Sequence, residues 1–471
     1  MGGRIIVLDI GKTMAKLTLW DGGELVDRCS RQNARSGAGE RAVLDAAGIE
    51  AWLVETLRHF AAQGPVRAII PVAHGAAVAV IRDGRLAAAP VDYEAPIAAT
   101  DRASYDRERD VFAQTGSPAL PDGLNLGAQL FALEKRRPDL LEPGATLLLW
   151  PQYWAWLLSG IAASEVTSLG CHTDLLLPNQ ARPSDLARNR GWAALLPPLR
   201  KAGEPLGPLR PELAEATGLS PETTIYCGLH DSNAALLAAR GFPEIADEES
   251  TVLSTGTWFV AMRTPAPGTH VEIGALPEAR DCLVNVDAFG HPVPSARFMG
   301  GREIETLTGI DTRRIDIVPD QPDLVAALPQ AIASGAMVLP TFAAGVGPFP
   351  HARGRWIGMP TVEAERRAAV SLYAALVADV SLDLIGSRER LLIEGRFAEA
   401  QVFVRALATL RPDTAVYVAN AHNDVSFGAL RLIDPDLRPA SRLTRVAPLD
   451  LPLNDYRRQW RAAAEQMEQA A

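Results

Sequence analysis

His230 and Asp231 place an imidazole beside a carboxylate, at the point where an apolar, glycine-punctuated segment turns into an Ala- and Leu-rich helix. A carboxylate in such a position can accept the proton of a substrate hydroxyl. It can equally be a helix cap and nothing more. The two roles do not exclude each other. We expect any acid–base chemistry of this chain to depend on Asp231.

Two short turns could bind phosphate, namely Gly11-Lys12-Thr13 and Thr255-Gly256-Thr257. Each interrupts a pair of predicted strands. Backbone N–H groups converge at a hairpin tip, and glycine lets an anion approach closely. An ordinary surface turn is the alternative for each tip taken alone. A Walker A loop is excluded, because that motif needs a glycine where Ile6 stands.

Further candidate residues lie at the ends of predicted strands. Asp9 could hold a water molecule on Mg²⁺, which keeps several waters in phosphate sites. Gly395 could let an adenine lie against the backbone, since α/β proteins bind ligands beyond strand ends. A plain strand-to-helix turn is the alternative at Gly395, and a packing role is the alternative at His74. The eight histidines show no metal-ligand spacing, so we expect no histidine-based metal site.

Regular elements that would position these residues alternate along the chain. The apolar patterns predict helices and strands whose order indicates an α/β protein. The predicted strands cover 5–10, 14–20, 25–30, 66–70, 251–254, 258–262, 390–394 and 415–419, and the predicted helices cover 41–62, 125–136, 150–158 and 398–410.

The strand–tip–strand pattern occurs twice, and each copy opens one half of the chain. We therefore expect two duplicated domains facing a cleft. A chain of 471 residues exceeds one ordinary core. The acidic stretch 244–249 is the predicted boundary. We therefore expect an N-terminal domain over 1–243 and a C-terminal domain over 244–471.

Composition restricts the possible partners. A net charge of −10 argues against general binding to nucleic acid or to an anionic membrane. The four cysteines form no CxxC pair, which is typical of reduced cytosolic thiols. With neither a signal peptide nor an apolar run of membrane-spanning length, the sequence favours a cytoplasmic protein.

Taken together, these residues resemble the FGGY family of carbohydrate kinases, and most closely its rhamnulokinase and fuculokinase branch, where a Gly-x-His-Asp element also occurs. The matching pieces follow the family order over most of the chain. They are the segments 9–13, 150–160, 228–235, 254–257 and 427–429, together with Gly395.

The resemblance implies two actin-like (ribonuclease-H-like) domains and the MgATP-dependent phosphorylation of a ketose hydroxyl, with L-fuculose, L-rhamnulose and pentuloses as candidate substrates. Asp231 matches the general base of the family. The other residues implied fall into two groups, the sugar contacts His74, Gly75, Gln152 and His230, and the nucleotide contacts Gly11, Lys12, Thr13, Thr255, Gly256, Gly395 and Asn423. The only partners we expect are the sugar substrate and a second copy of the chain in a homodimer.

One departure from the family pattern concerns the adenosine loop, where Arg396 and Phe397 follow Gly395 in place of small residues. Arg396 could stack on adenine or narrow its pocket. It is the feature that favours an alternative function, a sugar or nucleotide sensor that has lost turnover. An actin-like ATPase that acts on proteins is a third hypothesis. A screen for sugar-dependent ADP release separates the three.

Overall fold

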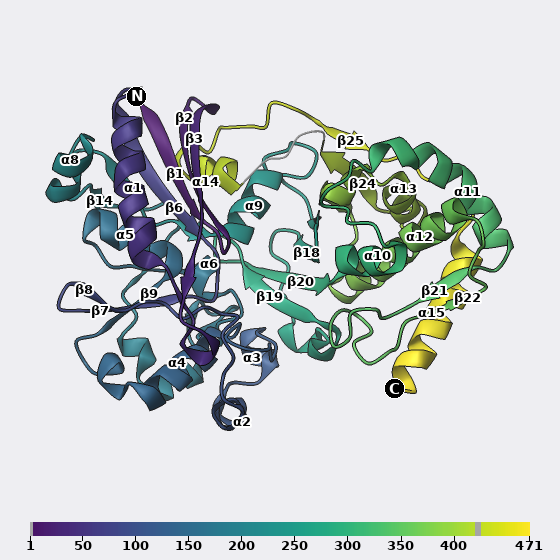
Figure 1. Ribbon diagram of the computed structural model, residues 1–471, viewed down its shortest axis with the longest axis horizontal. Helices are drawn as coiled ribbons and strands as arrows, with labels where there is room; N and C mark the ends of the chain where they lie inside the picture. The colour runs from purple at the N-terminus through teal and green to yellow at the C-terminus, as the bar shows by residue number, and fades with distance from the viewer. Residues whose placement is uncertain (1–2, 420–424) are drawn as a thin grey trace. The chain divides into compact units, whose positions relative to one another are not determined.

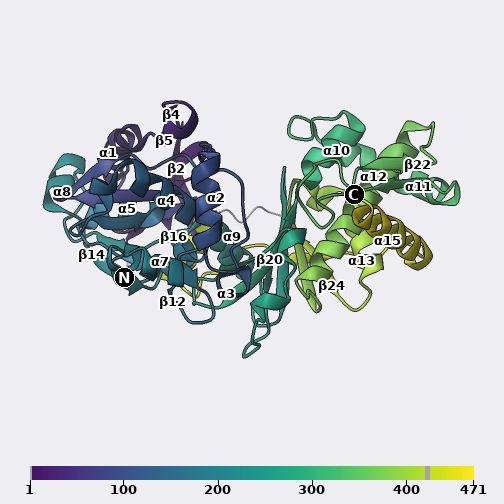
Figure 2. The same cartoon turned by 90° about the horizontal axis from the view of Figure 1, so that it is seen from below.

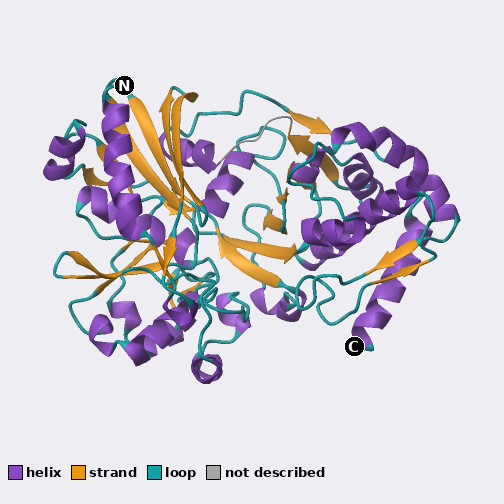
Figure 3. Ribbon diagram, viewed as in Figure 1, coloured by secondary structure: helices purple, strands orange, loops and turns teal. Residues whose placement is uncertain are grey.

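A computed structural model describes residues 3–419 and 425–471, which fold into two compact units (Figure 1). Both units mix helices and strands (Figure 3). Unit 1 consists of Met1–Gly241, Val284–Pro292 and Asn423–Pro439, and unit 2 of Phe242–Leu283, Val293–His422 and Ala440–Ala471. The first crossing thus lies close to the predicted boundary at 243/244, but two later segments return to unit 1.

The main sheet of unit 1 begins as an antiparallel meander and continues with parallel strands. Its order is β14-β15-β6-β1-β2-β3, with β16 also paired to β6. The predicted meander is confirmed, and the strand predicted at 66–70 runs on to Ala73. The strands are β1 (Arg4–Ile10), β2 (Met14–Asp21), β3 (Glu24–Gln32), β6 (Val66–Ala73), β14 (Pro205–Pro208), β15 (Thr224–Tyr226) and β16 (Leu229–His230).

Helix α1 (Ala46–Ala61) packs on this sheet through an apolar face that includes Leu53, Leu57 and Phe60. It starts later than the predicted 41–62 because Asp45 caps it, accepting a hydrogen bond from the N–H of Gly48 at 2.9 Å. The remaining helices of this unit are α2 (Ala99–Glu108), α3 (Phe112–Thr115), α4 (Leu126–Arg136), α5 (Trp150–Ser159), α6 (Val166–Leu169), α7 (Asp185–Asn189), α8 (Pro211–Thr217), α9 (Asp231–Ala239) and α14 (Val425–Ile433).

Helix α14 explains why a late segment of the chain belongs to unit 1. It packs against α9 and β1, and its yellow ribbon lies among the purple strands in Figure 1. A Cβ atom on Gly428 would come within 1.8 Å of the carbonyl oxygen of Ala234, so glycine is what lets the two helices approach. The hydroxyls of Ser426 and Thr18 are 3.2 Å apart.

Unit 1 also contains a three-stranded sheet of order β8-β7-β9. The segment at 284–292 also packs here, with the N–H of Val284 donating to the carbonyl of Gly116 at 2.8 Å. The strands of the small sheet are β7 (Val78–Arg82), β8 (Arg85–Ala88) and β9 (Thr146–Leu149).

The main sheet of unit 2 has the order β19-β20-β18-β17-β23-β24-β25. Strands β17 and β18 are antiparallel, and β17, β23 and β24 are parallel to one another. The strands are β17 (Ser250–Thr255), β18 (Phe259–Thr264), β19 (Cys282–Val286), β20 (Pro292–Phe298), β23 (Arg390–Gly395), β24 (Ala415–Ala419) and β25 (Leu443–Arg445). A separate hairpin joins β21 (Met337–Leu339) and β22 (Arg355–Ile357).

Helices α11, α12 and α13 of unit 2 pack together over a large apolar core, and both views place them side by side (Figures 1 and 2). The helix predicted at 398–410 begins only at Gln401, because residues 396–399 form a 3₁₀ turn. The helices are α10 (Gly300–Thr308), α11 (Gln321–Ala333), α12 (Glu363–Leu384), α13 (Gln401–Leu410) and α15 (Asn454–Gln469).

The two main sheets repeat one arrangement. In unit 1 the strands run β3-β2-β1-β6-β15, and in unit 2 they run β20-β18-β17-β23-β24, so that three antiparallel strands precede two parallel ones in each. This order is that of the ribonuclease-H-like, or actin-like, fold. The predicted fold class is therefore confirmed. Within the described residues, no helix combines the length and apolar character needed to cross a bilayer.

Candidate active site

Three neighbouring strands of unit 1 end at the predicted sugar and metal residues. Ile10 of β1 and His230 of β16 both stand opposite Ala73 in β6, and all three strands are parallel. The N–H of His74 donates to the carbonyl of Ile10 at 3.1 Å, which ties the strand ends together. The crevice beyond parallel strand ends is where α/β folds bind ligands. The sheet thus brings Asp9, His74 and Asp231 to one edge.

Asp231 is the first residue of α9, and its side chain is 27% exposed. Its Oδ1 accepts from the N–H of Ser232 at 2.6 Å and from the hydroxyl of Ser232 at 3.3 Å. The same oxygen lies 3.2 Å from Nε2 of His230. All three contacts fall on Oδ1, so the local structure orients the carboxylate through one oxygen only. The helix N-terminus also favours its negative charge.

His230 is buried, and burial lowers the pKa of its imidazole, although nearby Asp231 raises it. Nδ2 of Asn233 lies 3.3 Å from Nδ1 of His230. An amide nitrogen can only donate, so Nδ1 accepts and the neutral ring carries its proton on Nε2. That N–H faces Oδ1 of Asp231 and the Sγ of Cys171, which is 3.4 Å away.

His74 is also buried and neutral, because burial lowers its pKa more than the carbonyl of Gly75 raises it. Nδ1 of His74 is 2.7 Å from that carbonyl and donates to it, which makes Nε2 the acceptor. A Cβ atom on Gly75 would lie 2.8 Å from Sγ of Cys171 and 3.0 Å from Nε2 of His230. The absence of a side chain at Gly75 therefore leaves room for the imidazole of His230. A contact between Gly75 and the sugar stays a prediction.

Hydrogen bonds to backbone carbonyls hold the tip at Gly11-Lys12-Thr13 in its conformation. The N–H of Gly11 donates to the carbonyl of Met14 at 3.0 Å, and Asn33 donates to the carbonyls of Gly11 and Thr13, at 2.8 Å each. Asp9, 6% exposed, lies 3.5 Å from Nζ of Lys16. A phosphate-binding role for this tip stays a prediction.

Lys12 has a partner that the sequence did not indicate. Its ammonium forms an ion pair with the fully buried carboxylate of Asp92 and lies 4.0 Å from the ring centroid of Tyr93. Withdrawing Lys12 would leave a buried charge poorly compensated. An ammonium has three N–H donors, so a contact of Lys12 with a phosphate would share the lysine with this ion pair.

Gln152 is fully buried within α5. Its Nε2 lies 3.4 Å from the carbonyl of Cys227 and 3.3 Å from that of Gly228. Gly228 has φ +78°, and a Cβ atom there would come within 2.1 Å of the carbonyl oxygen of Pro71. Gln152 thus supports the turn that leads to His230, and its burial speaks against the predicted direct contact with sugar.

Three further side chains at this edge were not among the site residues expected from the sequence. Tyr93 packs edge-on against His74, with ring centroids 5.5 Å apart, and burial raises its pKa. Trp150 lies 6.5 Å from His74 in the same measure. Cys171 contacts His230. Only long-range packing brings these side chains together, so no local spacing could have found them.

A buried hydrogen-bond chain also reaches the backbone of His230. Glu165, which caps α6, accepts from the hydroxyl of Thr167 at 2.6 Å and from the N–H groups of Thr167 and Ser168. The hydroxyl of Thr167 in turn accepts from the N–H of His230 at 3.0 Å. Burial raises the pKa of Glu165 to about 7, against the effect of these donors.

In unit 2 the structure brings together Thr255, Gly256 and Gly395. Thr255 and Gly395 are direct neighbours in the parallel register of β17 and β23. The hydroxyl of Thr255 donates to the carbonyl of Glu394 at 2.6 Å and accepts from the N–H of Phe397 at 3.0 Å. Gly395, with φ +84°, would place a Cβ 2.3 Å from the carbonyl oxygen of Thr255. Thr255 therefore shapes the turn at Gly395.

The departure at Arg396 has a structural counterpart. Its guanidinium donates to the hydroxyl of Thr312 at 2.9 Å and lies 5.9 Å from the ring centroid of Phe397. The side chain thus has protein partners of its own. Asn423, the remaining predicted nucleotide contact, lies outside the described residues.

Comparison with known proteins identifies the family of proteins that share this fold. Residues 247–440 match carbohydrate kinase FGGY, C-terminal domain. A carbohydrate kinase from Novosphingobium aromaticivorans, of solved structure, is 59% identical with a TM-score of 0.94, covering 98% of this chain and 100% of that one. The chain belongs to the FGGY family of carbohydrate kinases, and the predicted family is confirmed.

Two curated relatives match a shorter part. The rhamnulokinase of Halalkalibacterium halodurans is 30% identical over 131 residues, which is 28% of this chain and 27% of that protein. The L-fuculokinase of Haemophilus influenzae is 33% identical over 136 residues, again 28% and 27%. The chain thus matches about a quarter of the length of these curated relatives, and the branch of the family that was predicted is the one they represent.

Proposed function

We propose that this protein transfers the γ-phosphoryl group of ATP to a hydroxyl of a ketose, with unit 1 binding the sugar and unit 2 the nucleotide. The observation that carries the proposal is the state of Asp231, a partly exposed carboxylate oriented by neutral neighbours at the edge where three parallel strands end. A cytoplasmic location and a homodimer are further parts of the proposal.

Asp231 acts as the general base. Its Oδ1 is held by Ser232 and His230, so Oδ2 is the oxygen that accepts the proton of the sugar hydroxyl as that hydroxyl attacks the phosphorus. The N–H at Nε2 of His230 faces Oδ1 of the carboxylate and fixes its direction. Phosphoryl transfer depends mainly on positioning and charge neutralisation, which such preorganisation supplies.

Sugar recognition uses neutral groups. His74 presents Nε2 as an acceptor toward a sugar hydroxyl, and the Tyr93 ring forms an apolar wall beside it. An uncharged ketose suits this set, since Lys12 and Lys16, the two lysines that the structure places here, each have an acidic partner. The similarity to rhamnulokinase and L-fuculokinase supports L-rhamnulose, L-fuculose or a pentulose.

The nucleotide and the metal are assigned to residues at the strand ends and the tips. The adenosine is assigned to the turn at Gly395, which adjoins Thr255 where β17 and β23 end. A phosphate is assigned to Gly256, where a Cβ atom would have, among the described residues, only the carbonyl oxygen of Trp258 within 4 Å, at 3.8 Å. Asp9 is a nearly buried carboxylate at a strand end, a hard oxygen donor of the kind that Mg²⁺ prefers, so it fits the water-mediated role. Mg²⁺ supplies charge neutralisation for the phosphates when bound.

ADP release over a panel of ketoses and polyols tests the proposal. We expect release that depends on L-rhamnulose, L-fuculose or a pentulose, and a loss of roughly 10²–10⁴-fold in turnover for Asp231→Asn. The exposed variant Asp455→Asn is the control and should keep full activity. Sugar binding without sugar-dependent release would favour the sensor instead, and release indifferent to every sugar would favour a protein-directed ATPase.

A further inference from the structure

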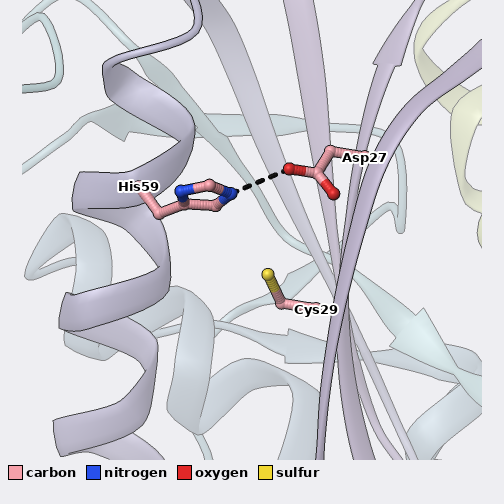
Figure 4. A group of neighbouring side chains, drawn as sticks. All are labelled: Asp27, Cys29 and His59. Atoms are coloured by element: carbon pink, nitrogen blue, oxygen red, sulfur yellow. Dashed lines mark hydrogen bonds and ion pairs between the residues drawn. The ribbon is translucent and has the colours of Figure 1, made fainter.

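Strand β3 and helix α1 of unit 1 bring three different metal-ligating side chains together, apart from every residue assigned above. Asp27 and Cys29 are two positions apart on β3 and therefore face the same side of the sheet. His59 comes from the last turn of α1. Figure 4 shows the imidazole, the carboxylate and the thiol directed into one space between strand and helix.

The ligand atoms of these residues are close. Nε2 of His59 is 2.8 Å from Oδ2 of Asp27, and the three ligand atoms all lie within 4.8 Å of one another. Within the described part of the chain, no other group of three His, Cys or acidic residues meets that limit. Sequence spacing could not reveal this group, because strand and helix are joined only by packing.

Small movements of the side chains would bring these distances to those around one bound cation. Metal–ligand bonds of about 2.0–2.3 Å in tetrahedral geometry put ligand atoms about 3.3–3.6 Å apart. The pair His59–Asp27 is slightly closer than this, so a cation would replace its hydrogen bond. Rotation of exposed side chains can make the adjustment, since His59 is 55% and Asp27 31% exposed.

The chemistry of the ligands selects the metal. One sulfur, one nitrogen and one oxygen donor suit a borderline ion such as Zn²⁺, whereas Mg²⁺ and Ca²⁺ prefer oxygen alone. Gln63, whose Nε2 donates to Oδ2 of Asp27 at 2.5 Å, stands beside the fourth position. A water molecule, or the amide oxygen of Gln63 once the amide has turned over, would complete the tetrahedron.

We propose that Asp27, Cys29 and His59 form a zinc-binding site that joins the edge strand β3 to helix α1. This site is independent of the proposed kinase activity. The strand is the last in its sheet and carries exposed Leu25 and Val26. A cross-link from an edge strand to its covering helix would raise the thermal stability of unit 1.

The first test uses the full chain, freed of metal with a chelator and titrated with Zn²⁺ against a chromogenic competitor. We expect one equivalent to bind and the melting temperature to rise with it. Cys29→Ser and His59→Gln should each weaken binding by at least about 10-fold. The control is His351→Gln, at an exposed histidine of unit 2, and it should bind zinc as the unchanged chain does.

The second test reads the thiol directly. Co²⁺ in place of Zn²⁺ should give a thiolate-to-cobalt charge-transfer band that Cys29→Ser abolishes and Cys282→Ser leaves intact, with circular dichroism verifying the fold of each variant. Failure of the unchanged chain to bind zinc would overturn the proposal. The proposal would also be overturned if Cys29→Ser and His59→Gln bound zinc as tightly as the unchanged chain does, whatever the kinase assay shows.

Discussion

The hydroxyl of Thr167 accepts a hydrogen bond from the backbone N–H of His230 at 3.0 Å. Because that hydroxyl also donates to Glu165, a fully buried carboxylate fixes the backbone one residue before Asp231. The proposed base is therefore oriented on two sides, through its carboxylate by Ser232 and His230 and through its backbone by Thr167.

Thr167→Val tests this backbone anchor. Loss of the hydroxyl leaves the His230 N–H without its acceptor and lets the turn shift, so we expect kcat to fall about 10- to 100-fold, because small displacements of a catalytic group are costly. KM should change less. Thr167→Ser keeps the hydroxyl and should keep most of the activity. Steady-state kinetics on the best sugar provides the measurement, and a Thr167→Val enzyme with unaltered kcat would contradict the anchor.

The buried imidazole of His74 makes a pH-dependent contribution to stability. Burial holds its folded-state pKa below the usual 6.5, so the unfolded chain takes up the proton first. The stabilisation is present above pH 6.5 and is lost as the pH falls toward the lowered folded-state pKa. The free energy of unfolding of the unchanged chain, relative to the non-titrating His74→Gln variant, should therefore decrease below pH 6.5.

Urea unfolding of both proteins between pH 5 and pH 8 measures this difference. The exposed His351→Gln variant should follow the unchanged chain at every pH. A gap between the unchanged chain and His74→Gln that stays constant over the range would show that His74 is not held neutral by burial.

Gly428→Ala tests the contact of α14 with α9. In a free helix alanine is favoured over glycine by about 1 kcal/mol. Here the added Cβ would lie 1.8 Å from the carbonyl oxygen of Ala234, so the helices must separate. We expect a net loss of about 1–3 kcal/mol in the free energy of unfolding, as for other overpacked sites. If chemical unfolding showed Gly428→Ala to be more stable than the unchanged chain, α14 and α9 would not be in the close contact described.

Asp379 of α12 is the centre of an ionic cluster in unit 2. Its fully buried carboxylate meets Arg411 at 2.9 Å, Arg457 at 2.7 Å and Arg461 at 2.6 Å. Asp379→Asn leaves three guanidinium groups with Asp383 as their shared counter-charge. We expect the free energy of unfolding to fall by about 3 kcal/mol. This is at the lower end for a broken buried ion pair, because two of the arginines are partly exposed.

Asp455→Asn on α15 is the matched control for that cluster. Asp455 pairs with Arg458 at the surface, where both side chains are more than 70% exposed. Such a pair contributes little, so its loss should cost under about 1 kcal/mol. Thermal and chemical unfolding of both variants gives the comparison, and similar losses in the two would contradict the central place of Asp379.

The sequence predicted what local patterns determine. Alternating apolar residues and a glycine tip define β1 and β2, and again β17 and β18, and Gly160 ends α5 where it was expected. The placement of Asp9, His74 and Asp231 at strand ends follows from the same patterns, because parallel strands present their carboxyl ends at one edge.

What the sequence did not predict depends on contacts between distant segments. Nothing near Lys12 in the chain indicates that Asp92 would neutralise it, nor that Gln152 would turn inward to the backbone of Gly228. Nor does the sequence indicate that the hydroxyl of Thr255, a predicted phosphate contact, holds the turn of Gly395. Which polar groups a side chain contacts depends on which of them are buried beside it. That is determined only once the sheets have formed.

The return of α14 to unit 1 bears on how the protein is made. The ribosome completes α9, with Asp231 at its start, long before it reaches α14, the helix that covers α9 and begins at Val425. Until that late segment emerges, the small-residue face of α9 around Ala234 has no partner from α14. The packing of unit 1 around α9 can therefore be completed only after the segment Val425–Ile433 has been synthesised.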